Sequence, residues 1–325
     1  MTDHFIKPCD YDSLTSYIRG RVQHNTQRTQ KKYLVILHGP PASGKSHGTH
    51  IACRIIYDYF EKTVPLAELK QTFLNTNVDN LTYDILTSNQ ISVKQQLIDN
   101  LYAILNDLPL TYNQPELIEQ IRTMPRLDPN KQKDVELVLS KIDSLVSSSY
   151  EIYQKYRPDN ISEIMFYMSA FLGLNIFLET CSGDPAYLSR IIESLKYYGY
   201  IPIIIYPFIN EIDVIYARSV KRGMKEGRFI CQSRIKESMH KCANNYPKLI
   251  EIVGQNEQYG YYQYDSNYDD CEVFLEEIYD TNNSEILNKH LLDFCVKNNN
   301  SPNSRFVGTN IITIRSRNYL QQIAF

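Results

Sequence analysis

Residues 38–47 constrain this chain more than any other stretch. They read His-Gly-Pro-Pro-Ala-Ser-Gly-Lys-Ser-His and fill every fixed position of the pattern G-x-x-x-x-G-K-[ST]. The apolar run 33–37 stands directly before them, where the pattern requires a buried strand, and apolar residues after them recur at helical spacing. A strand, a glycine-rich loop and a helix in this order predict a phosphate-binding loop (P-loop, residues 39–46).

The residue types of the P-loop predict how it holds a nucleotide. Glycine at 39 and 44 permits the tight turn that points backbone N–H groups at a phosphate. We expect Lys45 to reach the β- and γ-phosphates of ATP and the Ser46 hydroxyl to ligate Mg²⁺. The helix expected to begin near Ser46 points the positive end of its dipole at the same phosphates. The expected ATP-binding residues are Gly39, Ala42, Ser43, Gly44, Lys45, Ser46 and His47.

The composition is that of a globular protein. The 325 residues are 43% hydrophobic and 22% charged, and the net charge of −3 favours neither a nucleic-acid nor a membrane surface. Seven scattered cysteines without a C-x-x-C pair indicate a reduced setting without structural zinc. Because the start lacks an apolar signal region and no run of about 18 apolar residues occurs, we expect a cytoplasmic protein.

The order of predicted elements favours an α/β fold with a doubly wound, mostly parallel sheet and a helical insertion. Residues 1–31 form an N-terminal helix and linker in this interpretation, 32–80 and 173–281 the core, 81–172 the insertion and 282–325 a C-terminal extension. The insertion has no glycine between residues 81 and 172, and its apolar residues fall at helical spacing.

Further elements are assigned by residue pattern. The strands are expected at 73–79, 174–179, 201–209, 249–253, 259–264 and 306–314, and the helices at 185–198, 211–226, 233–244, 272–279 and 285–296. In the strand 201–209, Pro202 and Pro207 are expected to bracket the part that pairs. The Asn-rich tract 298–304 is a predicted loop.

Two carboxylates follow predicted strands. Asp79 closes the strand after the P-loop helix, and Glu179 closes the strand after the insertion. Ligands of open α/β sheets bind outside the carboxyl ends of the strands, so both are expected to face the phosphates. Asp79 could accept a proton from an attacking hydroxyl or hold Mg²⁺, and Glu179 could bind substrate or metal. A turn aspartate and a solvent-facing glutamate are the simpler alternatives.

A basic segment follows the strand at 201–209. Its cations are Arg218, Lys221, Arg222, Lys225, Arg228, Arg234 and Lys236. Phosphoryl transfer spreads negative charge over equatorial oxygens, which arginines stabilise, so Arg218, Arg222 and Arg228 are catalytic candidates. Arg228 lies just past Gly227, where a flexible cover could hinge. A solvated helix face is the alternative.

Other motifs exclude competing chemistry. Residues 134–143 resemble a guanine-recognition segment, but their apolar spacing is helical and no D-x-x-G follows the P-loop. The seven histidines show no metal-ligand spacing, although His38, His47 and His50 flank the loop and could tune its electrostatics. G-x-S-x-G and RNA-module patterns are absent from the sequence.

The ordered set resembles the zeta-toxin-like branch of P-loop kinases over about half the chain. The matching stretches are 35–46, Asp79, 175–180, 187–200 with the following strand, 217–230 and 264–267. The resemblance implies phosphorylation of a hydroxyl with ATP and Mg²⁺, several members using UDP-N-acetylglucosamine. It implies phosphate binding by Lys45, a base at Asp79, substrate or metal contact by Glu179 and charge neutralisation by an arginine between 218 and 228. The insertion, the first 31 residues and the C-terminal tail depart from that family.

Three functions remain open. The first is an ATP- and Mg²⁺-dependent phosphotransferase acting on a small acceptor, with a nucleotide or nucleotide sugar as first candidate. The second is a kinase of nucleic-acid 5′ ends, which the net acidity and the lack of aromatic stacking platforms oppose. The third is a nucleotide-bound scaffold without turnover. The residues do not identify a protein partner.

Overall fold

The computed structural model describes residues 29–60, 62–78, 91–110, 114–146, 158–181, 184–209, 211–254, 260–265, 275–279 and 311–316, with single residues 16, 20 and 81. Asp79, most of the expected N-terminal helix, the expected helix 285–296 and the loop 298–304 lie outside the described residues. The chain groups into two compact units. We name Arg21–Asn77, Ile164–Ile212 and Lys236–Phe325 the sheet unit, and Met1–Gly20, Val78–Glu163 and Asp213–Ile235 the helical unit.

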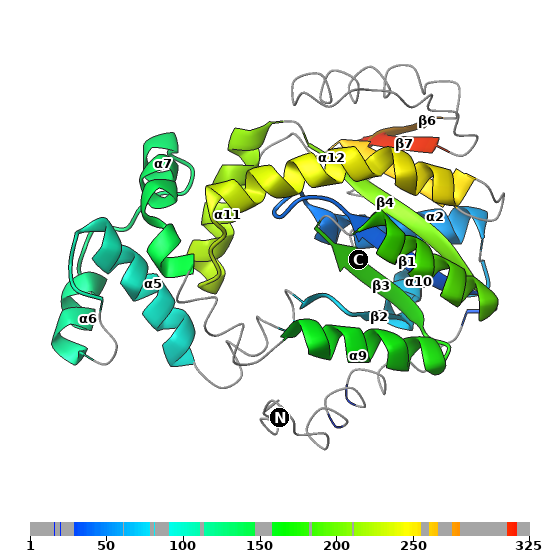
Figure 1. The fold of residues 1–325 in the computed structure, drawn as a ribbon, viewed down its shortest axis with the longest axis horizontal. Helices are drawn as coiled ribbons and strands as arrows, with labels where there is room; N and C mark the ends of the chain where they lie inside the picture. The colour runs from blue at the N-terminus through cyan, green and yellow to red at the C-terminus, as the bar shows by residue number, and fades with distance from the viewer. Residues whose placement is uncertain are drawn as a thin grey trace. The chain divides into compact units, whose positions relative to one another are not determined.

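The sheet unit is built on seven described strands in the order β2-β3-β1-β4-β5-β7-β6 (Figure 1). The strands are β1 (Lys32–His38), β2 (Phe73–Asn75), β3 (Asn175–Thr180), β4 (Tyr200–Phe208), β5 (Gly260–Asp265), β6 (Leu275–Tyr279) and β7 (Ile311–Ser316). Six are parallel, and β6 alone pairs antiparallel, with β7. The predicted α/β class is therefore confirmed, and β7, from the expected C-terminal extension, lies inside the sheet.

The two prolines of β4 lie within its paired region. Pro202 is in register with Leu34 of β1, at a point where β5 has not yet begun. Pro207 is in register with Tyr264 of β5, beyond the last pair of β4 with β1. Each missing N–H therefore falls where β4 has one partner strand rather than two, which is where a sheet tolerates proline. The prediction that the prolines bracket the pairing was wrong for this reason.

One core cluster joins the central strands to the helix after the P-loop. Helix α2 (Lys45–Tyr59) packs on β1 and β4, and alternate residues of these strands, such as Val35 and Ile203, lie in a buried cluster with Ile51 and Ile55 of α2. Because side chains alternate along a strand, Leu34 and Ile36 are buried on the opposite face. The central strands are thus covered on both faces, as their continuous apolar sequence requires.

Helix α10 begins and ends as its sequence predicts. It spans Pro185–Tyr197 and packs on β4, and the Asp184 carboxylate accepts a hydrogen bond from the Ala186 N–H at 2.9 Å. Gly199 follows with a φ of 78°, a left-handed conformation that glycine adopts without strain. The sheet unit also contains α3 (Leu66–Leu69), the 3₁₀ turn η1 (Lys70–Thr72) and, from Ile164 onward, α9 (Pro158–Phe171).

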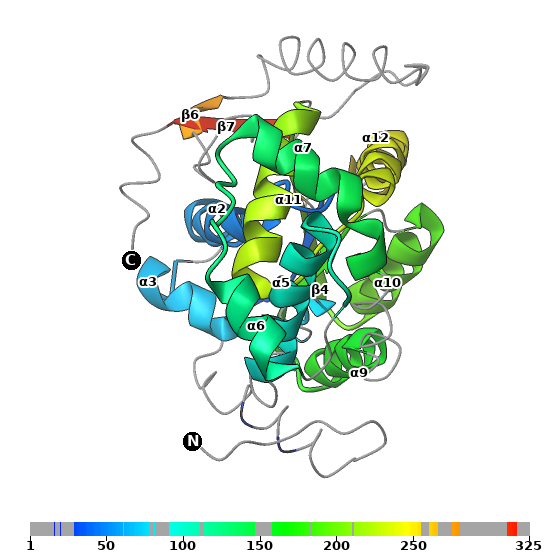
Figure 2. The ribbon, with the colours of Figure 1, turned by 90° about the vertical axis from the view of Figure 1, so that its left-hand side faces the viewer.

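The helical unit gathers α5 (Ile91–Leu105), α6 (Pro115–Arg122), α7 (Gln132–Lys141) and α11 (Ile212–Glu226), whose residues from Asp213 belong to it. Figure 1 shows α5 and α7 between α6 and α11, and Figure 2 shows the same four helices from the side. Tyr102 and Ala103 of α5, Ile121 of α6 and Met224 of α11 pack together. The basic segment thus belongs to the same compact unit as the predicted insertion.

Two predicted elements were wrong in type. The expected helix 272–279 is in part the strand β6, and the expected strand 249–253 is the end of helix α12 (Gln232–Gly254). In α12 the buried residues Ile235, Met239, Cys242 and Leu249 continue one helical stripe, which outweighs the strand propensity of the apolar run.

The strand before Asp79 also ends early. β2 stops at Asn75, whose side-chain oxygen accepts a hydrogen bond from the Asn77 N–H at 2.9 Å. Such a turn competes with continued strand pairing. Asp79 therefore follows β2 by four residues and does not close it.

Candidate functional site

The P-loop forms a tight turn between β1 and α2. The Gly39 N–H donates to the Thr180 carbonyl at 3.1 Å, which ties the loop to the end of β3. A Cβ at Gly39 would lie 2.9 Å from both Pro207 Cγ and Ser43 Oγ, so a side chain there would collide. Ala42 and Gly44 have φ of 59° and 90°, in the left-handed region that turns successive amides inward.

The start of α2 suits an anion. Its N-cap is Gly44, which makes no side-chain capping bond, and no acidic residue stands in the first turn of this described helix. The positive end of the helix dipole is therefore left for a negatively charged ligand. The Ser46 side chain is exposed in this first turn, where its hydroxyl fits the metal-ligating position of the motif.

Lys45 places its charge inside the loop. The side chain is buried, and its Nζ donates to the carbonyl oxygens of Gly39 at 2.9 Å and Pro40 at 2.7 Å. The same Nζ lies 3.5 Å from the Sγ of Cys181, directly after β3. The Lys45 ammonium is thus held by two backbone carbonyls inside the loop, where Ala42 and Gly44 have left-handed backbone angles. A positive charge at this place can bind the phosphates of a nucleoside triphosphate.

His38 stands behind the loop as a neutral ring. Its Nε2 lies 3.5 Å from the carbonyl oxygen of Cys242, which can only accept, so Nε2 carries the proton. The ring stacks on Tyr206, with centroids 5.6 Å apart. Complete burial lowers the pKa of His38 to about 4, the charge of Lys45 adds to this shift and the bond to Cys242 opposes it.

The lowered pKa of His38 predicts acid sensitivity of folding. Between pH 6.5 and 4 the unfolded chain binds a proton that the folded chain excludes, so stability is full above this window and is lost as the pH falls through it. From pH 7 to 5 the loss from this group should be about 2 kcal/mol. Urea unfolding measures the free energy of unfolding at pH 7 and at pH 5. The difference between these two values should be smaller by this amount in His38→Gln than in the wild type, because glutamine takes up no proton and still offers an N–H donor to the Cys242 carbonyl. His240→Gln, at an exposed position of α12, is the matched control; an unchanged pH dependence in His38→Gln would contradict the assignment.

His50 interacts outside the loop. Its Nε2 lies 3.2 Å from the Nζ of Lys70, and because an ammonium only donates, the ring accepts. Burial, followed by the charges of Lys70 and His47, lowers the pKa of His50 to about 4. Of these two histidines, His38 is the one whose pKa is shifted by the charge of Lys45.

Of the two predicted carboxylates, the structure places one. Glu179 is in register with Leu37 of β1 and is partly buried, so it lies at the carboxyl edge where β1 leads into the P-loop. Asp79 lies outside the described residues, and β2 ends at Asn75. Within the described part of the chain, no three His, Cys, Asp or Glu side chains cluster as a metal site.

The three candidate arginines lie in the helical unit, whereas the P-loop and Glu179 lie in the sheet unit. Arg218 is buried, Arg222 and Arg228 are partly buried, and Arg228 Nη2 lies 3.5 Å from Glu226 Oε2. Burial sets Arg218 apart from the solvated face of the simpler alternative, whereas Lys221, Lys225, Arg234 and Lys236 of the same segment are exposed.

Gly227 ends α11 in a packed turn. Its φ is 73°, and its N–H donates to the Gly223 carbonyl at 2.7 Å. A Cβ there would lie 3.0 Å from the Lys94 carbonyl oxygen of α5. Phe229 folds back so closely that a Cβ on Gly223 would lie 2.3 Å from its ring. The turn that carries Arg228 is therefore closely packed against α5 and Phe229.

Comparison with known proteins identifies a relative. No family model matches the chain. It is 37% identical over 313 residues to the uncharacterized protein L872 of Acanthamoeba polyphaga mimivirus, covering 95% of this chain and 84% of the relative. The chain belongs to the L872 family.

Among solved structures, this member of the L872 family is similar to a chain of the PezAT chromosomal toxin-antitoxin system of Streptococcus pneumoniae. The identity is 14%, with 90% of this chain and 97% of that chain covered, and the TM-score is 0.35. A TM-score of this size establishes no common fold. Within the described part of this L872-family chain, every helix is too short or too polar to cross a bilayer.

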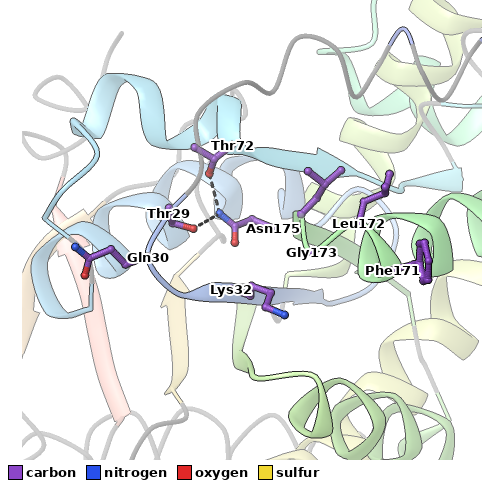
Figure 3. Close-up of a pocket in the computed structure, with 9 residues that line it drawn as sticks. Thr29, Gln30, Lys32, Thr72, Phe171, Leu172, Gly173 and Asn175 are labelled. Atoms are coloured by element: carbon purple, nitrogen blue, oxygen red, sulfur yellow. Dashed lines mark hydrogen bonds between the residues drawn. The ribbon is translucent and has the colours of Figure 1, made fainter.

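Figure 3 shows a cavity of about 400 Å³ at the other edge of the sheet, among residues that begin β1 and β3. It is lined by Thr29, Gln30, Lys32, Thr72, Phe171, Leu172, Gly173, Leu174 and Asn175. The Asn175 amide donates to Thr29 Oγ1 and Thr72 Oγ1, each at 2.9 Å, and its oxygen accepts from the Tyr33 N–H at 2.9 Å. The cavity lies at the starts of β1 and β3, whereas the P-loop follows the end of β1, so this cavity is not the P-loop site.

Cys242 is the site residue that the sequence did not indicate. It comes from the middle of α12 and brings both a carbonyl and a thiol to the flank of the P-loop, 204 residues after His38. No local motif marks such a position, because it depends on how α12 packs.

Substituting Gly223 tests the packed turn in this L872-family protein. In Gly223→Ala the new methyl would overlap the Phe229 ring, costing about 1 to 3 kcal/mol, against a gain in helix propensity of about 1 kcal/mol. Urea unfolding should therefore show a net loss. In a Phe229→Leu background the methyl has room, and the same substitution should become neutral or stabilising. If Gly223→Ala changed the free energy of unfolding equally with Phe229 and with leucine at this position, the Phe229 ring would not require a glycine at position 223.

Proposed function

We propose that this protein is an ATP- and Mg²⁺-dependent phosphotransferase that moves the γ-phosphoryl group to a hydroxyl of a small acceptor. A nucleotide or nucleotide sugar is the first acceptor class to test. In this proposal the α/β fold is the doubly wound P-loop kinase type, similar to zeta toxins, with a helical insertion. The observation that carries it is the buried Lys45 in a loop where Ala42 and Gly44 have left-handed backbone angles, before a helix whose first turn holds no acidic residue.

Each residue has a role that its chemistry supports. The loop amides and Lys45 hold the β- and γ-phosphates, and the Ser46 hydroxyl would hold the metal. Bound Mg²⁺ would neutralise charge on the β- and γ-phosphates. Glu179, at the carboxyl edge of β3, binds the acceptor.

Proton removal and charge stabilisation complete the transfer. The Asp79 carboxylate takes the proton of the acceptor hydroxyl as the hydroxyl oxygen attacks the γ-phosphorus, the bond from this phosphorus to the β,γ-bridging oxygen breaks, and ADP leaves. One of Arg218, Arg222 and Arg228 stabilises the charge on the equatorial oxygens. The burial of Arg218 supports this role for that side chain over a basic surface for nucleic acid.

A transfer assay tests the proposal directly. The full chain is incubated with Mg²⁺ and γ-labelled ATP against three pools: nucleosides and nucleotides, nucleotide sugars, and a 5′-hydroxyl oligonucleotide. Label is expected in a small acceptor, with none formed when magnesium is chelated. Label in the oligonucleotide alone would favour a 5′-end kinase. Tight ATP binding without transfer to any pool would favour a scaffold and overturn the proposal.

Asp79→Asn tests the proposed base. It should lower kcat by about 10²- to 10⁴-fold because general-base catalysis is lost, while the Kd for ATP changes little. Asp107→Asn is the matched control, since Asp107 is exposed and has a φ of 54° that asparagine also adopts. Transfer by Asp79→Asn at the wild-type rate would remove Asp79 as the base.

A further inference from the structure

Two cysteines in contact with each other lie beside the P-loop lysine. The Sγ of Cys181 lies 3.5 Å from Lys45 Nζ, and the Sγ of Cys242 donates to the Cys181 carbonyl at 3.1 Å. Cys181 directly follows β3 and Cys242 lies in α12, both in the sheet unit. A disulfide joins Cα atoms usually about 4.4 to 6.8 Å apart, and a contact from one Sγ to the other residue's carbonyl is compatible with this range.

The two thiols differ in access and reactivity. Cys181 is partly exposed, whereas Cys242 is fully buried. Burial raises the pKa of the Cys242 thiol, with the nearby Cys181 adding to the shift and the charge of Lys45 opposing it. A dissolved oxidant therefore reaches Cys181 first, and Cys242 is placed to react second.

We propose that Cys181 is an oxidation site for peroxides and that Cys242 is the thiol that resolves it into a disulfide. Cys181 sulfur attacks one peroxide oxygen, the O–O bond breaks, and a sulfenic acid forms with release of water or an alcohol. Cys242 sulfur then attacks the Cys181 sulfur, the S–O bond breaks and a second water leaves. Two electrons pass from the thiols to the peroxide, and an external dithiol then reduces the disulfide to the two thiols and is itself oxidised to a disulfide.

The disulfide would act on the P-loop through two contacts. Rotation of the Cys181 side chain toward Cys242 removes the sulfur that now faces Lys45 Nζ. It also holds Cys181 to α12, next to Thr180, whose carbonyl accepts the Gly39 N–H. The oxidised protein should therefore bind ATP more weakly, a consequence that rests on the proposed function.

Peptide mapping tests the oxidation site without any assay of activity. The reduced full chain is treated with stoichiometric hydrogen peroxide, remaining thiols are alkylated, and peptides are separated without reductant. The main product should link Cys181 to Cys242 and disappear with dithiothreitol. In Cys242→Ser, Cys181 should stop at a sulfenic acid that dimedone traps. Cys231→Ser is the matched control, because Cys231 is also partly exposed, and it should behave as the wild type. An unmodified Cys181, or its linkage to another cysteine, would overturn the proposal.

Nucleotide binding then tests the consequence. Peroxide should weaken binding of a fluorescent ATP analogue at least tenfold in the wild type and Cys231→Ser, but not in Cys181→Ser or Cys242→Ser. Dithiothreitol should restore it. If the reduced wild type binds no ATP, the proposed function fails while the mapped disulfide still stands. If the disulfide forms and ATP binding is unchanged, the link to the P-loop is wrong.

Discussion

Replacing Lys45 with alanine is expected to impair both phosphoryl transfer and ATP binding. Removing one preorganised donor from a charge-stabilising site costs about 10²- to 10³-fold in kcat. Loss of a charge-assisted hydrogen bond to phosphate should also weaken ATP binding by about 10- to 100-fold. Both follow from the placement of the ammonium within the turn, 2.9 Å from the Gly39 carbonyl oxygen.

The matched control for Lys45→Ala is Lys32→Ala. Lys32 Nζ also donates to a backbone carbonyl, that of Tyr198 at 2.7 Å, but from the opposite end of β1. Isothermal titration with ATP and the transfer assay should separate the two variants, while thermal unfolding should show that both remain folded. ATP affinity in Lys45→Ala equal to that of the wild type would exclude the P-loop as the nucleotide site.

The P-loop could be predicted from sequence because each of its determinants is local. The strand, the glycines and the start of the helix lie within consecutive residues, and Gly44 requires a positive φ that glycine supplies. The same holds for α10, where Asp184 and Pro185 mark the start. The burial of Lys45 and the fit at Gly39 follow from Pro207 and Cys181, which no local motif includes.

The errors have a different physical origin. Residues 249–253 and 275–279 are short mixed runs that suit either a strand or a helix, and tertiary packing decides between them. Leu249 joins the buried stripe of α12, and Leu275 pairs with Ser316 across β6 and β7. The grouping of the basic segment with α5 likewise depends on Met224 and Gly227, whose partners lie more than 100 residues away.

Asn175 should be the side chain whose loss destabilises the sheet unit most. It is buried at the first residue of β3, and its oxygen accepts the N–H of Tyr33, the second residue of β1. Its amide donates to Thr29 and Thr72, so one side chain joins the starts of β1 and β3 to the turn before β2 (Figure 3). In Asn175→Ala the buried Tyr33 N–H loses its partner, and we expect a loss of about 2 to 4 kcal/mol.

Urea unfolding of Asn175→Ala measures this loss, and Asn244→Ala, at an exposed position of α12 in the same unit, is the control. Asn175 lies at the amino ends of the parallel strands and the P-loop at their carboxyl ends. The substitution should therefore lower the stability without changing ATP binding. At low temperature, where the variant remains folded, its Kd for ATP should match that of the wild type. If Asn175→Ala were as stable as the wild type but bound ATP more weakly, the prediction would be wrong. The Asn175 amide would then act on the nucleotide site and would not stabilise the sheet.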